Sequence, residues 1–210
     1  AQLLAAHESI VFDRGVHAQE HSIEVQLPFL KRVCPDCAFV PIIVGRPTPE
    51  NVEILNQYKP HKILAACPHC YNTIKNEYPQ FGGNWEVYHH SEILANLMRQ
   101  GRLQPVSGMD KNLVFHDSCY LGRFNDIYEE PRALLKSISG LRFSEMDRSR
   151  NKAFCCGAGG GRMWMEETLG DQKINNARTD QAVTLNPDII GVCCPFCTTM
   201  LEDGLKDRDM

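Results

Sequence analysis

Two adjacent cysteines constrain the fold of this chain more than any other feature of its sequence. Cys155 and Cys156 lie in the stretch RNKAFCCGAGGGRMWMEE, residues 150–167, with Gly157 directly after them and three more glycines at residues 159–161. Consecutive Cα atoms are about 3.8 Å apart, below the usual disulfide range, so the two thiols are poorly placed to bridge to each other. We therefore expect a bent backbone that presents both sulfurs to a common partner.

The composition is that of an ordinary globular protein. The chain has 210 residues, of which 43% are hydrophobic and 23% charged, and its formal net charge is −4. This length accommodates one domain or two small ones, and the acidic balance argues against nucleic acid as a partner. The apolar runs are too short to span a bilayer, and residues 1–15 lack the pattern of a signal peptide.

Ten cysteines without a secretory signal favour metal binding over disulfide bonds. Clustered thiols in a cytosolic protein most often hold a metal, because that compartment keeps thiols reduced. We therefore predict a cytoplasmic, metal-binding protein with no membrane span of its own.

Strand-like and helical patterns alternate along the chain. The runs FVPIIVG, KILAA, NLVFHD and DIIGVC are typical of strands, and helical patterns occur near residues 50–58, 130–139 and 164–184 and directly after each C-P-x-C motif. This alternation predicts an α/β fold, with a mainly parallel sheet and flanking helices.

The sequence contains an internal repeat, because KILAACPHCYNTI aligns with IIGVCCPFCTTML. Cys67 aligns with Cys194 and Cys70 with Cys197. Cys193 aligns with an alanine, so we predict that it fills the end of a strand and does not bind metal.

The first copy of the repeat is truncated. In the second copy, Cys119 is followed after 35 residues by the cysteine pair, which is followed after 37 more by Cys194. Stepping back equally from Cys67 reaches Pro28 and Phe29, and the first cysteine would fall before residue 1. We therefore predict the C-terminal part of a first repeat over residues 48–108 and a complete second repeat over residues 109–210.

The second repeat offers five thiols, one more than a single tetrahedral zinc ion needs. An iron–sulfur cluster uses an adjacent pair on different metal atoms, so it accommodates all five. Gly157 would let the chain bend, Gly159 and Gly160 would let backbone N–H groups approach sulfides, and a helix from about Arg162 would direct its positive end at the cluster. The predicted ligands are Cys119, Cys155, Cys156, Cys194 and Cys197.

Four segments resemble the cysteine-rich CCG domain, which occurs in heterodisulfide reductases (in the B-subunit type) and in related bacterial iron–sulfur oxidoreductases, including the glycerol-3-phosphate dehydrogenase C-subunit type. They are CPHCYNTIKNEYPQFGGNWEVYHHSEIL, HDSCYLGRFNDIYEEPRALL, CCGAGGGRMWMEE and CCPFCTTMLEDGL, within about residues 50–210. The resemblance implies that the same five cysteines bind a noncubane [4Fe–4S] cluster. Cys67 and Cys70 would be the remnant of a first set and are additional candidate ligands.

The resemblance implies an iron–sulfur oxidoreductase related to heterodisulfide reductase. Such a protein transfers electrons or reduces a thiol, disulfide or quinone-linked substrate. It would work with a redox partner protein, either a flavoprotein or a ferredoxin-type iron–sulfur protein, and could associate through that partner with the inner face of the membrane. The truncated first copy leaves two alternatives, a non-catalytic cluster-binding module and a zinc-stabilised structural module.

The N-terminal segment has a different character. The stretch HAQEHSIEVQLPFLKRVCPDCAFVPIIVG is similar to part of the Memo-like proteins, so we predict a Memo-like fragment over residues 1–47. HAQEH also matches an inverted zinc-protease pattern, which the Memo-like match disfavours. A zinc ribbon formed by Cys34 and Cys37 with Cys67 and Cys70 is a further alternative, although its central gap is long.

Several side chains near the cysteines have two interpretations. His69, His116 and the pair His89–His90 would either hydrogen-bond the cluster or serve the packing of the protein. The stretch Met163–Met165 is predicted to pack in the core rather than to take part in redox chemistry.

Overall fold

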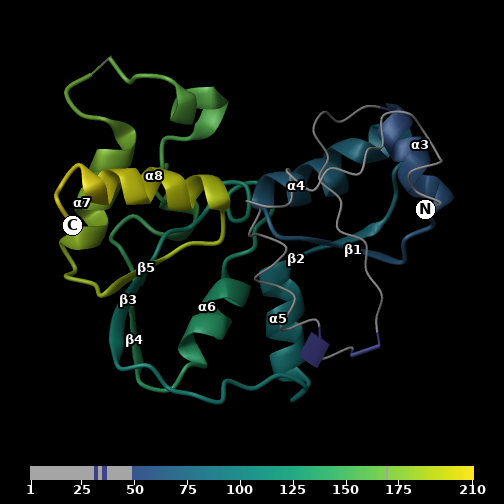
Figure 1. The fold of residues 1–210 in the computed structure, drawn as a ribbon, viewed down its shortest axis with the longest axis horizontal. Helices are drawn as coiled ribbons and strands as arrows, with labels where there is room; N and C mark the ends of the chain where they lie inside the picture. The colour runs from purple at the N-terminus through teal and green to yellow at the C-terminus, as the bar shows by residue number, and fades with distance from the viewer. Residues whose placement is uncertain (1–30, 33–34, 37–48, 169) are drawn as a thin grey trace.

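The computed structural model of the chain describes residues 31–32, 35–36, 49–168 and 170–210. Most of this part forms two halves that lie side by side in Figure 1. Helices α5 and α6 lie next to each other and pack together where the halves meet. The motif HAQEH, which matches the disfavoured zinc-protease pattern, and both cysteines of the segment CPDC fall outside the described residues.

The first half contains a two-stranded parallel sheet. Its elements are α3 (Pro49–Gln57), β1 (Lys62–Ala65), α4 (Pro68–Asn72), a π-helical turn (Thr73–Glu77), a 3-10 turn (Tyr78–Phe81), β2 (Glu86–His89) and α5 (His90–Arg99). Strands β1 and β2 pair in the register Ala65 to His89. The carboxyl end of β1 therefore leads directly into the first C-P-x-C motif.

The second half contains a three-stranded parallel sheet in the order β4–β3–β5. Its elements are β3 (Lys111–Phe115), α6 (Glu129–Lys136), β4 (Leu141–Ser144), 3-10 turns (Arg150–Lys152 and Gly159–Trp164), α7 (Ile174–Val183), β5 (Ile189–Gly191) and α8 (Pro195–Lys206). The central strand β3 buries Leu113, Val114 and Phe115, as expected where helices cover both faces. The prediction of an α/β fold with parallel strands is confirmed.

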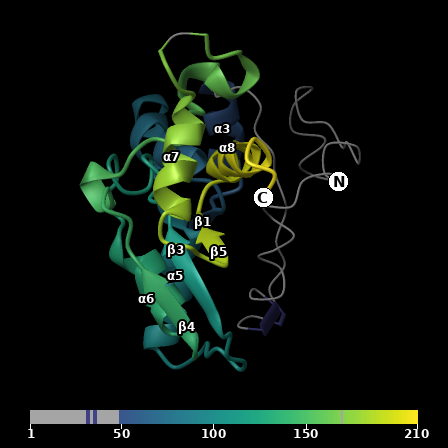
Figure 2. The same cartoon turned by 90° about the vertical axis from the view of Figure 1, so that its left-hand side faces the viewer.

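The helices of the second half lie in two places. Helix α7 packs against α8, while α6 packs against β4, as the turned view in Figure 2 shows. No helix in the described part of the chain is long and apolar enough to cross a membrane.

Two apolar clusters are important for the site: one joins the two halves, and the other contains buried cysteines. The first joins Ala65, Tyr71 and Val87 of the first half to Leu121 and Ile127, which follow β3 in the second. The second contains Cys156, Cys194, Cys197 and Met200. The cysteines are therefore part of the packed interior, beside the junction of the two halves.

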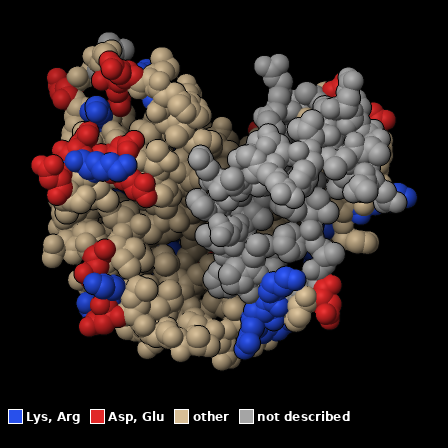
Figure 3. Space-filling model, viewed as in Figure 1, with Lys and Arg blue, Asp and Glu red and all other residues tan. Residues whose placement is uncertain are grey.

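Charged side chains gather in small clusters of mixed sign on the face shown in Figure 3. Among the ion pairs of the second half, Lys173 pairs with Asp207, and Arg208 with Asp180.

Candidate metal centre

The two C-P-x-C motifs have the same local structure. Cys67 is the N-cap of α4 (φ −109°, ψ 132°), and Cys194 is the N-cap of α8 (φ −146°, ψ 126°). A proline occupies the first helical turn in both, where its missing N–H costs nothing. The second cysteine of each motif follows three residues later on the same helix face. The predicted repeat is thus visible in the backbone.

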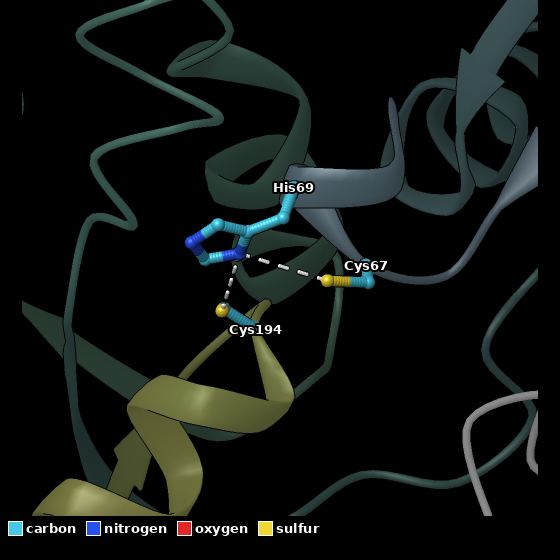
Figure 4. A group of neighbouring side chains, drawn as sticks. All are labelled: Cys67, His69 and Cys194. Carbon is cyan, nitrogen blue, oxygen red and sulfur yellow. Dashed lines mark hydrogen bonds between the residues drawn. The ribbon is translucent and has the colours of Figure 1, made fainter. Parts of the chain in front are cut away.

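The fold brings the two motifs together at the junction of the halves. The Nδ1 atom of His69 lies 3.7 Å from the sulfur of Cys67 and 3.8 Å from the sulfur of Cys194. Figure 4 shows the His69 ring reaching from the start of α4 toward the start of α8. The Cys67 thiol also contacts the thiols of Cys194 and Cys70.

A second group of donors lies within the second half. The ligand atoms of His116, Cys156 and Cys197 all lie within 4.8 Å of one another, and all three residues are buried. The Cys156 thiol contacts that of Cys155, and the Cys197 thiol contacts those of Cys156 and Cys194. A continuous line of interacting sulfurs therefore runs through Cys155, Cys156, Cys197, Cys194, Cys67 and Cys70.

Cys119 stands slightly apart from this line. It is half-buried, and burial together with the nearby charge of Cys156 raises its pKa. The structure thus brings four of the five predicted ligands into one line of interacting sulfurs and leaves Cys119 as their neighbour. All the described cysteines are free thiols.

Interactions between the thiols shift their pKa values in opposite directions. Hydrogen bonds from Cys194 and Cys70 hold the pKa of Cys67 far below the usual range, and bonds from Cys155 and Cys197 do the same for Cys156. The pKa values of Cys70, Cys155 and Cys197 are raised in turn. Negative charge therefore collects at two points of the line, as a cation site requires.

His69 responds to this charge. Burial alone would lower the pKa of its ring, but hydrogen bonds to Cys194 and Cys67 outweigh burial and raise the pKa to about 9. At neutral pH the metal-free chain therefore holds a positive charge between these two sulfurs.

The turn after the cysteine pair supplies backbone donors. The Gly157 N–H donates to the sulfur of Cys155 at 3.3 Å, and the Ala158 backbone hydrogen-bonds Cys156. Gly157 has φ +92°, and a Cβ there would lie 3.2 Å from the Cβ of Ile174, so only glycine fits. The prediction that this residue bends the chain at the cysteines is supported.

The predicted roles of the other glycines fare differently. Gly160 has φ +66° and thus shapes the turn, whereas Gly159 has no neighbour within 4 Å that would demand glycine. The predicted helix near Arg162 is wrong, because left-handed residues at 160 and 161 limit this segment to a 3-10 turn and α7 begins only at Ile174. The positive helix ends near the sulfurs are those of α4 and α8.

The predicted packing of residues 163–165 is only partly right. Met163 packs against the cysteine cluster, but Trp164 and Met165 are 74% and 62% exposed. A cavity of about 620 Å³ adjoins this segment, and Met163 and Met200 line it while also touching the cysteine cluster. One layer of methionine side chains thus separates the cavity from the sulfurs.

Two side chains beside the cysteines form a hydrogen-bonded pair. The sequence left the role of His116 open and gave no indication of Arg178. Arg178 is fully buried, and its Nε donates to Nδ1 of His116 at 3.0 Å. Because an arginine nitrogen is always a donor, neutral His116 must carry its proton on Nε2. His116 hydrogen-bonds Cys156, so that proton is available to the sulfur. The sequence gives no signal for this pairing, because an arginine within a helix is usually exposed.

A buried ion-pair network fixes the loop that carries Cys119. The Arg132 guanidinium is 1% exposed and makes paired hydrogen bonds to Asp117 (2.8 and 2.9 Å) and to Glu145 (2.6 and 2.8 Å). Asp117 also accepts from the Arg150 N–H at 2.7 Å. This network links β3, α6 and the segment before the cysteine pair.

His89 and His90 serve the first half instead of the sulfurs. His89 caps α5 in a capping box with Glu92, and burial lowers the pKa of His89 to about 3 and that of His90 to about 4. Both rings are therefore neutral in the folded chain at neutral pH.

Cys193 lies apart from the line of sulfurs. It packs against the apolar cluster that joins the halves, and burial raises the pKa of its thiol to about 12. Cys193 lies two residues after the end of β5 (Gly191), and its exclusion from the ligands stays a prediction.

Comparison with known families agrees with this geometry. Residues 113–202 match the model of the CCG cysteine-rich domain, and residues 1–61 match that of the Memo-like proteins. The Memo-like match extends past the predicted boundary at residue 47, so that boundary stays a prediction. No solved structure gives a significant match.

Several known proteins are similar to most of the chain. It is 50% identical over 160 residues to a probable iron-sulfur-binding oxidoreductase, FadF, of Bacillus subtilis, and 48% identical over 163 residues to an EtfAB:quinone oxidoreductase of Syntrophomonas wolfei. These alignments cover 76% and 75% of the chain. It is 37% identical over 159 residues, or 73% of the chain, to one component of a dihydromethanophenazine:CoB–CoM heterodisulfide reductase of Methanosarcina mazei.

The alignments cover only part of these relatives. They span 23% of the length of each of the first two and 38% of the third. The similarity therefore identifies a segment rather than a whole enzyme. Residues 113–202 belong to the cysteine-rich CCG family, as the motifs predicted.

Proposed function

We propose that the chain binds an iron–sulfur cluster and transfers electrons as part of an iron–sulfur oxidoreductase. The observation that carries this proposal is the line of interacting sulfurs, which joins the cysteine pair 155–156 to Cys197 and Cys194 at the start of α8. The proposed ligands are Cys119, Cys155, Cys156, Cys194 and Cys197.

The donor set fits a polynuclear cluster better than one zinc ion. Zinc would use four donors and leave thiols unused, while a cluster with several irons accommodates an adjacent pair. Backbone N–H groups of Gly157 and Ala158 and the N-terminus of α8 face the same sulfurs and favour an anionic group. The noncubane [4Fe–4S] type is the finer part of the proposal.

When bound, such a cluster accepts and releases single electrons. The chain's own side chains control the charge at its ligands. His116 holds a proton at Nε2 toward Cys156, and the Arg178 guanidinium fixes that tautomer from the other side. A hydrogen bond to a ligating sulfur withdraws negative charge, so it favours the reduced state. His116 and Arg178 are thus positioning residues that raise the reduction potential.

The relatives' names guide the choice of partners. One is named an EtfAB:quinone oxidoreductase and another a dihydromethanophenazine:CoB–CoM heterodisulfide reductase component, and both names describe the passage of electrons between a donor and an acceptor. We propose a flavoprotein or ferredoxin-type partner protein, and a thiol, disulfide or quinone-linked acceptor. A cytoplasmic location, with contact to the membrane through the partner, belongs to the same proposal.

The decisive experiment is anaerobic purification followed by iron, sulfide and zinc analysis and electron paramagnetic resonance of the oxidised protein. We expect about four irons and four sulfides per chain. Cys155→Ser and Cys156→Ser should each lose the iron, while Cys193→Ser should keep it. Zinc without iron in the wild type, even after reconstitution, would contradict the proposal.

A turnover assay distinguishes a catalytic oxidoreductase from a non-catalytic cluster-binding module. Oxidation of the reduced cluster by a quinone or a disulfide would support catalysis. A cluster that binds but reduces neither acceptor would instead favour the non-catalytic cluster-binding module.

A further inference from the structure

The first C-P-x-C motif differs from the second at one position beside the sulfurs. His69 stands where the second motif has Phe196, and the two rings touch edge to face with centroids 5.0 Å apart. The Tyr120 ring also contacts the His69 ring, with centroids 4.2 Å apart. The His69 ring is therefore held by two aromatic side chains, with its Nδ1 directed at the sulfurs of Cys67 and Cys194.

We propose that Cys67, His69 and Cys194 bind a divalent ion of the zinc class across the junction of the two halves, in the chain that carries no cluster. The three donor atoms come from the starts of α4 and α8 and lie within 4.8 Å of one another. The site goes beyond the proposed cluster, because it uses a histidine and both halves.

The distances fit a tetrahedral ion. Zinc binds sulfur at about 2.3 Å and nitrogen at about 2.0–2.1 Å, so two such donors in a tetrahedron are separated by about 3.6 Å. The observed sulfur-to-nitrogen distances are 3.7 and 3.8 Å. Both sulfur-to-nitrogen distances therefore exceed the tetrahedral value by only about 0.1–0.2 Å.

The surroundings also suit a cation. The Nδ1 atom of His69 lies near both sulfurs, and the rings of Tyr120 and Phe196 hold the imidazole in this position. The ion needs deprotonated sulfurs and a neutral imidazole, so its uptake releases protons to solvent. Two thiolates and one imidazole leave the fourth position to water or to the adjacent thiol of Cys70.

The site has one consequence for the cluster. Cys194 belongs both to this site and to the five proposed cluster ligands, so one sulfur serves two metals in turn. An ion bound at the junction uses Cys194 as a ligand, so that sulfur is not free to bind the cluster. The same ion also connects the start of α4 to the start of α8. Zinc-class ions and the cluster should therefore compete for the chain.

Cobalt(II) tests the site without any cluster. The reduced, metal-free chain is titrated with Co²⁺ under anaerobic conditions, and thiolate-to-cobalt absorption and bound cobalt are measured. His69→Ala and Cys67→Ser should each remove one bound ion per chain or weaken its binding tenfold or more. Cys193→Ser, whose thiol lies outside the site, should bind as the wild type does. Equal binding by wild type, His69→Ala and Cys67→Ser would overturn the proposal.

A measurement on the wild type guards against variants that fail to fold. X-ray absorption of the zinc-loaded chain should show a mixed shell of sulfur and one histidine nitrogen. A shell of sulfur alone would overturn the proposal.

Competition with iron then separates this proposal from that of the cluster. Zinc added first should block cluster reconstitution in the wild type and do so less in His69→Ala. A chain that never takes up iron would contradict the proposed function alone, because the cobalt titration would still decide the junction site.

Discussion

The two C-P-x-C motifs begin alike and end differently. Both open a helix with cysteine as N-cap and proline behind it, and their first sulfurs meet at the junction. Beyond that point α4 lasts five residues and passes into a π-helical turn, whereas α8 runs for twelve residues against α7. Cys70 is exposed as a result, and Cys197 is 2% exposed.

This difference shows what the motif contributes and what the rest of each half adds. The motif places two thiols at the N-terminus of a helix. Enclosure comes from the partner helix, the glycine turn and the paired cysteines, which the structure shows only in the second half of the described chain. Thiols enclosed in this way retain a cluster because water and oxidants reach them less.

The largest expected effect separates the second cysteines of the two motifs. Cys197→Ser should abolish iron binding, because it removes a buried sulfur in contact with Cys156 and Cys194. Cys70→Ser should retain most of the iron, because Cys70 is exposed and lies at the end of the line of sulfurs. Iron and sulfide content of the two purified variants measures the contrast. Equal iron loss in both would mean that the two motifs act as one ligand set.

The two halves also differ in the charge of their buried polar side chains. The second half buries an ion-paired arginine, whereas the first half buries a neutral histidine. The second half buries Arg132 against two carboxylates, so Arg132→Ala should lower the free energy of unfolding by about 3–5 kcal/mol, since Asp117 is left buried and unpaired. The exposed pair of Arg142 and Asp110 is a matched control. Arg142→Ala should cost at most about 1 kcal/mol.

Chemical denaturation of the three proteins measures these differences. If Arg132→Ala unfolds with the same free energy as Arg142→Ala, the buried network does not support the second half. Loss of iron from Arg132→Ala at a temperature where it remains folded would show that the network also positions Cys119.

The sequence predicted the parts of this structure that depend on local patterns. The two helix starts at Cys67 and Cys194, the strands that precede them and the bend at Gly157 all follow from residue types at fixed spacing. The start of helix α7 was predicted too early, because the left-handed conformation of residues 160 and 161 is a property of the backbone that the sequence leaves open. Strand β2 and helix α5 were missed because short amphipathic segments give weak signals.

The supporting charges were beyond the reach of the sequence for another reason. Arg132 and Arg178 lie on helices whose patterns place charged residues at the surface. Only the fold shows that one arginine faces Asp117 and the other His116, which are distant in sequence. The same holds for His69, whose partner Cys194 lies 125 residues away.

A close approach of helices distinguishes the second half and predicts a moderate effect. A Cβ on Gly204 would lie 2.1 Å from Oγ1 of Thr179, so Gly204→Ala should separate α7 from α8 and cost about 1–3 kcal/mol of unfolding free energy. Gly159→Ala is the control, because nothing lies within 4 Å of its added methyl group. Thermal unfolding should place Gly204→Ala well below the wild type and Gly159→Ala beside it; coincident transitions for both variants would contradict the close packing.

The smallest expected effect concerns pH and belongs to the first half, where buried histidines are neutral. Burial depresses the pKa values of His89 and His90 to about 3 and 4, while both would titrate near 6.5 in the unfolded chain. As the pH falls below 6.5 the unfolded chain gains protons that the folded chain excludes, so folding loses stability between about pH 6.5 and 4, by about 1 kcal/mol per pH unit for each histidine. Above pH 7 both states are neutral and the contribution is constant.

The measurement compares the unfolding free energies of the metal-free wild type and two variants at pH 7 and pH 5. His90→Gln removes one of the buried rings, so its loss of stability between these pH values should be smaller than that of the wild type. His61→Gln removes an exposed ring and should leave the loss unchanged. If His90→Gln follows the wild type at both pH values, the ring of His90 does not contribute to the acid sensitivity.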